Sequence, residues 1–192
     1  MQNAAKPRQV HGSEDFCSDA ELMALIGRGD REAFAALVRR HQRPLLGLFR
    51  RLGIDAHAAE DCAQETFLRV FRSSSRYRPI APFPAFLYKL ARQSWVDWGR
   101  RESRRALPAD PIDLAAFPAE PAGSIDDRLD LEAALRTLPE HLKWVVLLAV
   151  EAGLAHAEIG AVLEIPVGTV KSRMFHAVRR LRRALHAVPE GR

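Results

Sequence analysis

The stretch Ala155–Leu185, AHAEIGAVLEIPVGTVKSRMFHAVRRLRRAL, predicts two helices that meet at Glu164-Ile165-Pro166. In the second helix, apolar residues recur at steps of three and four and so share one helical face: Val170, Met174, Val178, Leu181 and Leu185. The same helix carries six cations and no acid: Lys171, Arg173, Arg179, Arg180, Arg182 and Arg183. A short helix, a tight turn and a second helix with a cationic outer face are typical of a helix-turn-helix DNA reader.

Charge is unevenly distributed along the 192 residues of this chain, whose formal net charge is +5. A second basic block lies within Lys89–Arg105, whereas Ala106–Asp127 holds five acids and neither Lys nor Arg. Either basic block alone is most simply a solvated helix face. Two such blocks on either side of an acidic connector indicate two separate contacts with nucleic acid. The hydrophobic content of 47% suffices for one or two packed domains.

Cysteine usage and hydropathy exclude several classes of protein. Cys17 and Cys62 are too few for a disulfide framework, and neither has a second thiol at metal-ligand spacing. His11 and Cys17 could share a metal in principle, but their spacing in an irregular tail argues against it. We therefore predict no metal and no cofactor. The longest apolar run, Trp144–Val150, is too short to cross a membrane, and Met1–Asp15 lacks the apolar core of a secretory signal. These features predict a cytoplasmic protein.

The predicted fold is all-α, with two small helical domains joined by a flexible linker. Residues 1–17 are expected to form a disordered tail, and 18–105 a domain of four helices. The segment 106–124 is acidic and rich in proline, so we expect an extended linker there. A second domain, 125–188, ends in the helix-turn-helix. No useful stretch of period-2 alternation predicts a strand.

Local signals set the helix boundaries of the first domain. Ser18 with Glu21 forms a capping-box pattern, and Asp30 and Asp55 are suited to cap the next two helices. Pro44 should kink or restart the second helix, because proline removes a backbone donor and clashes with the preceding turn.

The third predicted helix carries a mixed stripe beside its buried face. Its members are Asp61, Gln64, Glu65 and Leu68. Spacings of three and four place them together on the helix surface. An ordinary solvated stripe is the simpler interpretation. A docking face for a basic partner protein is the alternative, because an exposed leucine is flanked there by carboxylates and an amide.

The loop after this helix and the helix that follows combine cations, aromatic rings and an amide. The candidate ligand-binding residues are Arg76, Tyr77, Phe83, Lys89, Arg92 and Gln93. Cations can follow phosphates while rings and amides hold unpaired bases, a combination that favours single-stranded nucleic acid. The alternative is that the aromatic residues belong to the core, and we expect this for Phe86, together with Leu87 and Leu90.

Four motifs in order resemble the extracytoplasmic-function (ECF) group of bacterial RNA polymerase sigma factors. The first is Asp61-Cys-Ala-Gln-Glu-Thr-Phe-Leu, and the second is Phe86-Leu-Tyr-Lys-Leu-Ala-Arg with Asp97-Trp98 and Arg100-Arg101. The third is Leu138-Pro-Glu, and the last is Ile165-Pro-Val-Gly-Thr-Val-Lys-Ser-Arg. The resemblance runs over roughly Asp19–Arg101 and Asp127–Ala187, which is most of the chain.

The resemblance implies a role for each group of residues. The first domain would be sigma region 2, with Asp61, Gln64, Glu65 and Leu68 docking on core RNA polymerase. The loop and helix residues Arg76, Tyr77, Phe83, Lys89, Arg92 and Gln93 would bind the promoter −10 element and assist its opening. The second domain would be region 4, and its last helix would enter the −35 major groove through Lys171, Ser172, Arg173, Phe175, His176 and Arg179.

The resemblance also implies binding partners, and the chain departs from the family pattern at some positions. Core RNA polymerase, promoter DNA and an anti-sigma factor, often membrane-anchored, are the implied partners of this non-enzymatic protein. Ala155-His156 stands where similar proteins usually show Ser-Tyr, which removes a helix cap, and His176 replaces a common Arg.

Two other functions remain open from the sequence. One is a stand-alone helix-turn-helix transcriptional regulator, which would bind duplex operators without polymerase. The other is an enzyme acting on nucleic acid, such as a recombinase or nuclease. The latter is disfavoured because Asp61 and Glu65 have no third carboxylate beside them to hold a metal.

Overall fold

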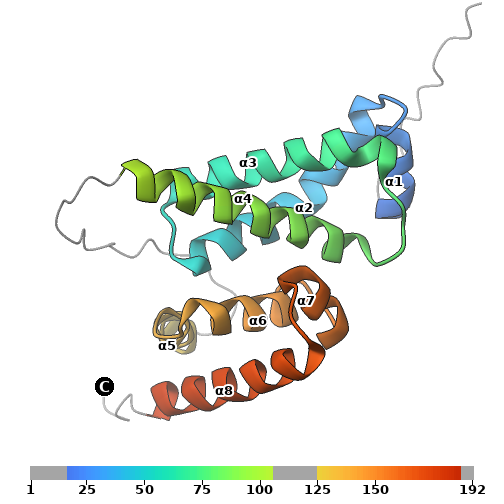
Figure 1. Cartoon of the computed structure of the whole chain (residues 1–192). Coiled ribbons are helices and arrows are strands. Elements are labelled where there is room, and N and C mark those ends of the chain that lie inside the picture. Colours follow the sequence, from blue (N-terminus) through green and yellow to red (C-terminus); the bar gives the residue numbers. More distant parts are fainter. Residues whose placement is uncertain (1–16, 106–124, 187–192) are drawn as a thin grey trace, which may run out of the picture.

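A computed structural model describes residues 17–105 and 125–186 of this chain. The described residues form eight α-helices and one short 3-10 helix: α1 (Asp19–Ile26), α2 (Arg31–Leu52), α3 (Ala56–Ser73), η1 (Ser74–Arg76), α4 (Phe83–Arg105), α5 (Ile125–Arg136), α6 (Glu140–Val150), α7 (His156–Leu163) and α8 (Val167–His186). Helices α1 to α4 form a first body and α5 to α8 a second body (Figure 1). The all-α, two-domain prediction is thereby confirmed. The expected tail and linker lie outside the described residues.

The helix starts of the first body follow the predicted caps. The Ser18 hydroxyl accepts a hydrogen bond from the Glu21 N–H, and the Glu21 carboxylate accepts one from the Ser18 N–H at 2.8 Å. Asp30 and Asp55 accept hydrogen bonds from backbone N–H groups at 3.0 and 2.8 Å, respectively. Helix α2 ends at Gly53, whose φ of 98° is the left-handed conformation that glycine adopts readily.

Helix α2 continues through Pro44 from Arg31 to Leu52, so the helix does not restart at the proline. Fully buried side chains lie on both sides of the proline, with Leu37 before it and Leu45 directly after it. Burial of these residues in one core holds both halves of the helix together, which offsets the hydrogen bond that proline removes.

In the helix-turn-helix of the second body, the backbone of α7 lies close to the backbone of the turn that follows it. Helix α7 begins at Ala155, which has no side-chain acceptor, so only the reverse half of a capping box forms: the Glu158 carboxylate accepts from the Ala155 N–H at 2.8 Å. The helix ends at Glu164, in the left-handed conformation at φ 57° and ψ 44°. A Cβ added at Gly160 would lie 2.9 Å from the Ile165 carbonyl oxygen, so the turn needs glycine there.

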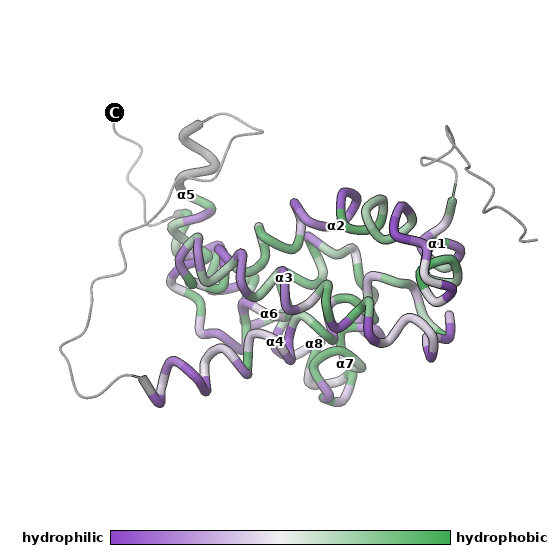
Figure 2. Tube along the Cα trace, turned by 90° about the horizontal axis from the view of Figure 1, so that it is seen from above, coloured by the Kyte–Doolittle hydropathy of each residue, from purple (hydrophilic) through white to green (hydrophobic). Residues whose placement is uncertain are grey.

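The two bodies pack against each other. Helix α4 lies along α7, and α2 contacts α5 and α6 (Figure 1). Viewed from above, α7 is mainly hydrophobic, whereas the end of α4 is strongly hydrophilic (Figure 2). One apolar cluster runs from Leu87 and Ala91 of α4 to Ile159 of α7. Within the described ranges, no helix is both long and apolar enough to span a bilayer.

Candidate nucleic-acid and protein interfaces

The predicted stripe on α3 is present, and three of its four members are exposed. Asp61, Gln64 and Leu68 lie at the surface, and Leu68 keeps 40% of its area exposed although it is a large apolar residue. Neighbouring Phe71 is 43% exposed and extends the apolar part of the surface. Buried Cys62, Thr66 and the rest of the inner face anchor α3 in the core, so the stripe is rigidly presented.

Glu65, the fourth member, is largely engaged within the protein. Its carboxylate accepts a hydrogen bond from Arg69 Nε at 2.9 Å and lies 3.8 Å from Arg72 Nη1. Arg69 also donates to Asp97 of α4 at 2.8 Å. The Arg69 guanidinium therefore links α3 to α4, and Glu65 helps to hold it. Burial lowers the pKa of Arg69, but the hydrogen bonds to Asp97 and Glu65 outweigh burial and raise it.

The aromatic residues after η1 form a packed cluster. Tyr77 and Phe83 lie with ring centroids 6.2 Å apart, Tyr77 and Phe86 with centroids 5.0 Å apart, and His41 with Phe83 also at 5.0 Å. Phe83 is only 4% exposed. The ring of Phe83, which was predicted to contact the −10 element, is therefore part of the core. Tyr77 is half-buried, and its ring also contributes to this cluster. Its buried hydroxyl has no hydrogen-bond partner.

Exposed residues remain on both sides of the aromatic cluster. Arg76 ends η1 and is exposed, and Ile80 of the following loop is 92% exposed. On α4, Lys89 and Gln93 are exposed and share one helical side, while Arg92 is half-buried beside them. Lys89 also lies 3.7 Å from the Glu164 carboxylate of the second body. This contact was not predictable from the sequence, because its two residues come from different domains.

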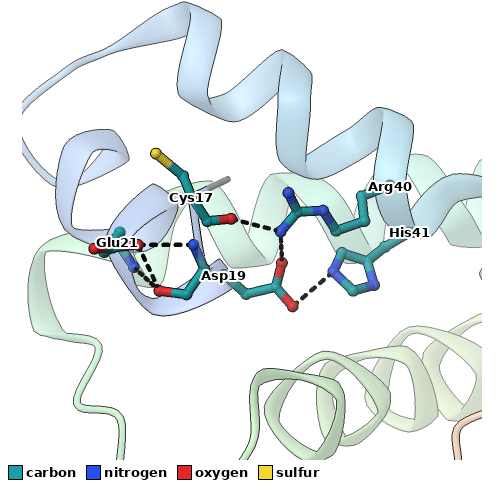
Figure 3. A network of polar contacts seen from close by, with 6 residues as sticks. Cys17, Asp19, Glu21, Arg40 and His41 are labelled. Carbon is teal, nitrogen blue, oxygen red and sulfur yellow. Dashed lines mark hydrogen bonds and ion pairs between the residues drawn. The ribbon is translucent and has the colours of Figure 1, made fainter. Parts of the chain in front are cut away.

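A polar network fixes α1 against α2 beside this cluster (Figure 3). Asp19 accepts hydrogen bonds from Arg40 at 2.7 Å and lies 3.0 Å from His41 Nε2, and Arg40 also donates to the Cys17 carbonyl at 3.0 Å. Burial raises the pKa of Asp19, but the hydrogen bonds from His41 and Arg40 outweigh burial and hold that pKa below its usual value. Since His41 contacts Phe83, the network is connected to the aromatic cluster.

The outer face of α8 is exposed and cationic. Lys171, Ser172, Phe175, His176 and Arg179 are all exposed, and Phe175 has 64% of its area accessible. The inner face is held by buried Val170 and Ala177, so the helix is fixed in orientation. In the part of the chain that the structure describes, no carboxylate lies within ion-pair distance of any α8 cation.

A groove of about 500 Å³ runs between α8 and the start of α6. Arg173 is half-buried and lies within it, together with the predicted residues His176 and Arg179. The remaining lining residues are Pro139, His141, Leu142, Arg180 and Arg183. His141, Arg180 and Arg183 were not predicted as site residues. The charge of the two arginines was visible in the sequence, but the approach of α6 was not.

The Cys62 thiol is buried in the core of the first body. Burial raises the pKa of Cys62 to about 11, with smaller contributions from nearby charges, so this thiol stays protonated at neutral pH. Within 17–105 and 125–186, no group of three or more potential metal ligands occurs.

The chain matches known families and relatives in sequence, and a solved structure in fold. The family models for sigma-70 region 2 and sigma-70 region 4 match residues 37–105 and 128–181. The ECF RNA polymerase sigma factor SigE of Mycolicibacterium smegmatis is 39% identical over 163 residues, covering 80% of this chain and 63% of SigE. The RNA polymerase sigma-H factor of Pseudomonas aeruginosa is 31% identical over 180 residues, covering 87% and 93% of the two chains. The solved structure of sigma factor RpoE in complex with the anti-sigma factor NepR, from Bartonella quintana, has a similar fold: its TM-score is 0.69 at 22% identity, covering 81% of this chain and 98% of that one.

Proposed function

This chain belongs to the ECF sigma factors of the sigma-70 family, and from that membership and its surfaces we propose that it directs core RNA polymerase to promoters. In this proposal, it acts as a non-catalytic subunit in the cytoplasm, where the polymerase works. It binds core polymerase through α3, the −10 element through the loop and α4, and the −35 element through α8. A protein inhibitor, as in the solved RpoE–NepR complex, is a further proposed partner.

The observation that carries the proposal is the unpaired cationic face of α8 on a helix-turn-helix. Six like charges on one helix repel one another and do not stabilise the fold. They become favourable when phosphates approach, because each neutralised phosphate releases counterions. Lys171, Ser172, Phe175 and His176 near the helix start are placed to contact base edges, each good contact being worth roughly 1–3 kcal/mol of discrimination.

The first body supplies the contacts that a stand-alone regulator would not need. Asp61, Gln64 and Leu68 present a carboxylate, an amide and an apolar side chain on one rigid helix, which suits docking on a basic protein surface. Arg76, Lys89, Arg92 and Gln93 remain as the proposed −10 contacts, with Tyr77 at their edge. Phe83 is assigned a supporting role because it is buried. Holding single-stranded DNA on this surface offsets the free energy of unstacking.

The docking assignment is tested by binding of the chain to core polymerase. Asp61→Arg with Gln64→Ala should abolish co-elution with core enzyme and transcription from a responsive promoter. Glu102→Arg is the control, because Glu102 is also an exposed acid but lies on a different helix, and it should bind as the native chain does. Unchanged core binding by the Asp61/Gln64 variant would refute the assignment.

The two DNA assignments are separated by a second experiment with reconstituted holoenzyme. Lys171→Ala should weaken binding to duplex −35 DNA about tenfold or more while leaving opening of a pre-bound promoter intact. Arg76→Ala should impair opening, read by permanganate reactivity of unpaired thymines, and leave −35 affinity unchanged. If native chain binds promoter duplex equally well with and without polymerase, the stand-alone regulator becomes the better assignment.

A further inference from the structure

The loop 77–82, which joins η1 to α4, is exposed along its middle and anchored at both ends. Residues 78–82 are all exposed, whereas Tyr77 before them is half-buried and Phe83 after them is buried. This loop and Arg76 before it are part of the surface proposed to take the −10 element. The exposed middle of the loop is held in place only as well as its two ends are, so the contacts of those ends set where the loop lies.

The first end of the loop is held by Gly27, the residue that caps the end of α1 (Figure 1). A Cβ added there would lie 3.2 Å from the Ser74 carbonyl oxygen and 3.4 Å from the Ser75 Cα, so the two backbones meet directly. Gly27 has φ −61° and ψ −17°, an ordinary helical conformation that alanine also adopts. Glycine is therefore needed for close approach and not for backbone shape. The same Ser74 oxygen accepts the Tyr77 N–H at 3.2 Å, the hydrogen bond with which the loop begins.

The second end of the loop is held by the first residue of α1, Asp19. Its carboxylate lies 3.0 Å from His41 Nε2 of α2 (Figure 3). The His41 ring packs on Phe83, the first residue of α4, with centroids 5.0 Å apart. Phe83 in turn contacts the Tyr77 ring. Burial raises the pKa of Tyr77 and the charge of Asp19 raises it further, so the field of α1 reaches the start of the loop.

We propose that α1 is a positioning element for the 77–82 loop, acting through Gly27 at one end and through Asp19 with His41 at the other. This rests on the proposed function, in which the loop contacts the −10 element. The family model for region 2 begins at residue 37, after α1 has ended. The three positioning residues act through the loop and need not touch DNA. A loop that is already held at both ends loses less conformational freedom when a base binds, so it binds more tightly and selects more sharply.

The first test measures amide hydrogen exchange of the free full-length chain by mass spectrometry, in the segment 74–82. Gly27→Ala should speed exchange there, on the order of three- to tenfold, because the new methyl group displaces the Ser74 oxygen that holds the Tyr77 N–H. Gly99→Ala is the matched control, since it makes the same change in the same domain and nothing lies within 4 Å of its Cβ. Unchanged exchange in Gly27→Ala, or an equal change in both variants, would overturn the proposal.

The second test measures sequence preference at each promoter element. Reconstituted holoenzyme transcribes a library of barcoded templates randomised at the −10 and −35 elements, and the transcripts are sequenced. Gly27→Ala and Asp19→Asn should each lower enrichment of the preferred −10 sequence about fivefold, as for the loss of one weak base contact, and leave the −35 preference unchanged. A smaller folded fraction would lower transcription from all templates alike. Equal losses at both elements, or native preferences in both variants, would refute the positioning role.

A double variant tests the path from Asp19 to the loop. His41→Phe keeps a ring beside Phe83 and removes the contact with Asp19. Asp19→Asn with His41→Phe should therefore lower −10 enrichment no further than the worse single variant, because both changes break one tie. Asp19→Asn with Gly27→Ala should show the product of the two single losses, since these residues hold different ends. Independent effects of Asp19 and His41 would overturn the proposed path. A native holoenzyme that enriches no −10 sequence would instead overturn the proposed function, which the exchange measurement does not use.

Discussion

In the first body, three helices begin at a capping side chain from Ser18, Asp30 or Asp55, whereas Pro139 and Ala155 cap neither α6 nor α7 with a side chain. Arginines of the first body, such as Arg40 and Arg69, are held in ion pairs that join helices. Within the described residues, the second body has no ion pair between two of its own side chains.

This difference shows where each body directs its polar groups. The first body uses them to fix one helix on the next, so its charged residues contribute to stability. The second body relies on apolar packing of residues such as Val145, Leu148 and Ile159, pairs glutamates such as Glu151 with the first body, and leaves the outer face of α8 to solvent. Charge in the first body should therefore affect folding, and charge on α8 should affect binding. Substitutions in the two bodies can test this contrast.

The largest effect is expected for Arg69→Ala. The substitution removes hydrogen bonds to two carboxylates and leaves Glu65 and Asp97 facing each other without a cation between them. Hydrogen bonds to charged groups contribute about 1.5–3 kcal/mol each, so we expect the free energy of unfolding to fall by about 3 kcal/mol. Urea denaturation followed by circular dichroism measures it. A loss below about 0.5 kcal/mol would remove the contrast between the bodies.

Gly160→Ala should be the most damaging small substitution in the second body. The new Cβ would lie 2.9 Å from the Ile165 carbonyl oxygen, and the turn must shift to make room. Overpacking of this kind costs roughly 1–3 kcal/mol. Gly168→Ala is the matched control, because nothing lies within 4 Å of its Cβ and it lies in α8. That change should instead raise the melting temperature, since alanine favours a helix over glycine.

Ala155→Ser should stabilise the second body by about 1 kcal/mol, because it supplies the missing acceptor at the start of α7. The backbone is already suited to a cap, at φ −68° and ψ 156°. Differential scanning calorimetry can measure the gain. A serine without effect would show that the Glu158 bond alone satisfies this helix end.

Acidification should weaken the first body through Asp19. Its pKa is lower in the folded chain than in the unfolded chain, so its contribution is complete above the unfolded value and is lost as pH falls through the folded value. At pH 7, Asp19→Asn should cost about 1 kcal/mol. Below about pH 4, the native chain and the variant should converge in melting temperature. A difference that stays constant down to pH 2 would contradict the assignment.

The smallest effect on stability is expected for Arg180→Ala with Arg183→Ala. Both side chains are exposed and without an acidic partner in the described structure, so the free energy of unfolding should change by less than about 0.5 kcal/mol. If each arginine binds a phosphate, the plot of the logarithm of the duplex-binding constant against the logarithm of salt concentration should become less steep. Its slope should change by about 0.9 for each arginine removed. Titrations at several salt concentrations measure this. A large loss of stability with an unchanged slope would reverse the contrast.

Local signals in the sequence predicted much of this fold. Caps at Ser18, Asp30 and Asp55 fixed helix starts because a cap depends on residues only three positions away. The exposure of Asp61 and of Lys171 followed from helical periodicity for the same reason. Contacts between distant segments were not predictable, among them the groove at His141 and the burial of Phe83. The continuation of α2 through Pro44 was not predictable either, because core packing on both flanks overrides the local signal of a helix breaker.

Glu164 has two structural roles, one for its backbone and one for its side chain. Its backbone takes the left-handed conformation that ends α7, and its carboxylate meets Lys89 of the other body. Glycine there would relax the backbone while deleting the carboxylate, whereas glutamine would keep the backbone requirement and remove only the charge. A substitution at this one position between α7 and α8 can therefore alter the contact between the two bodies without altering any side chain on the outer face of α8.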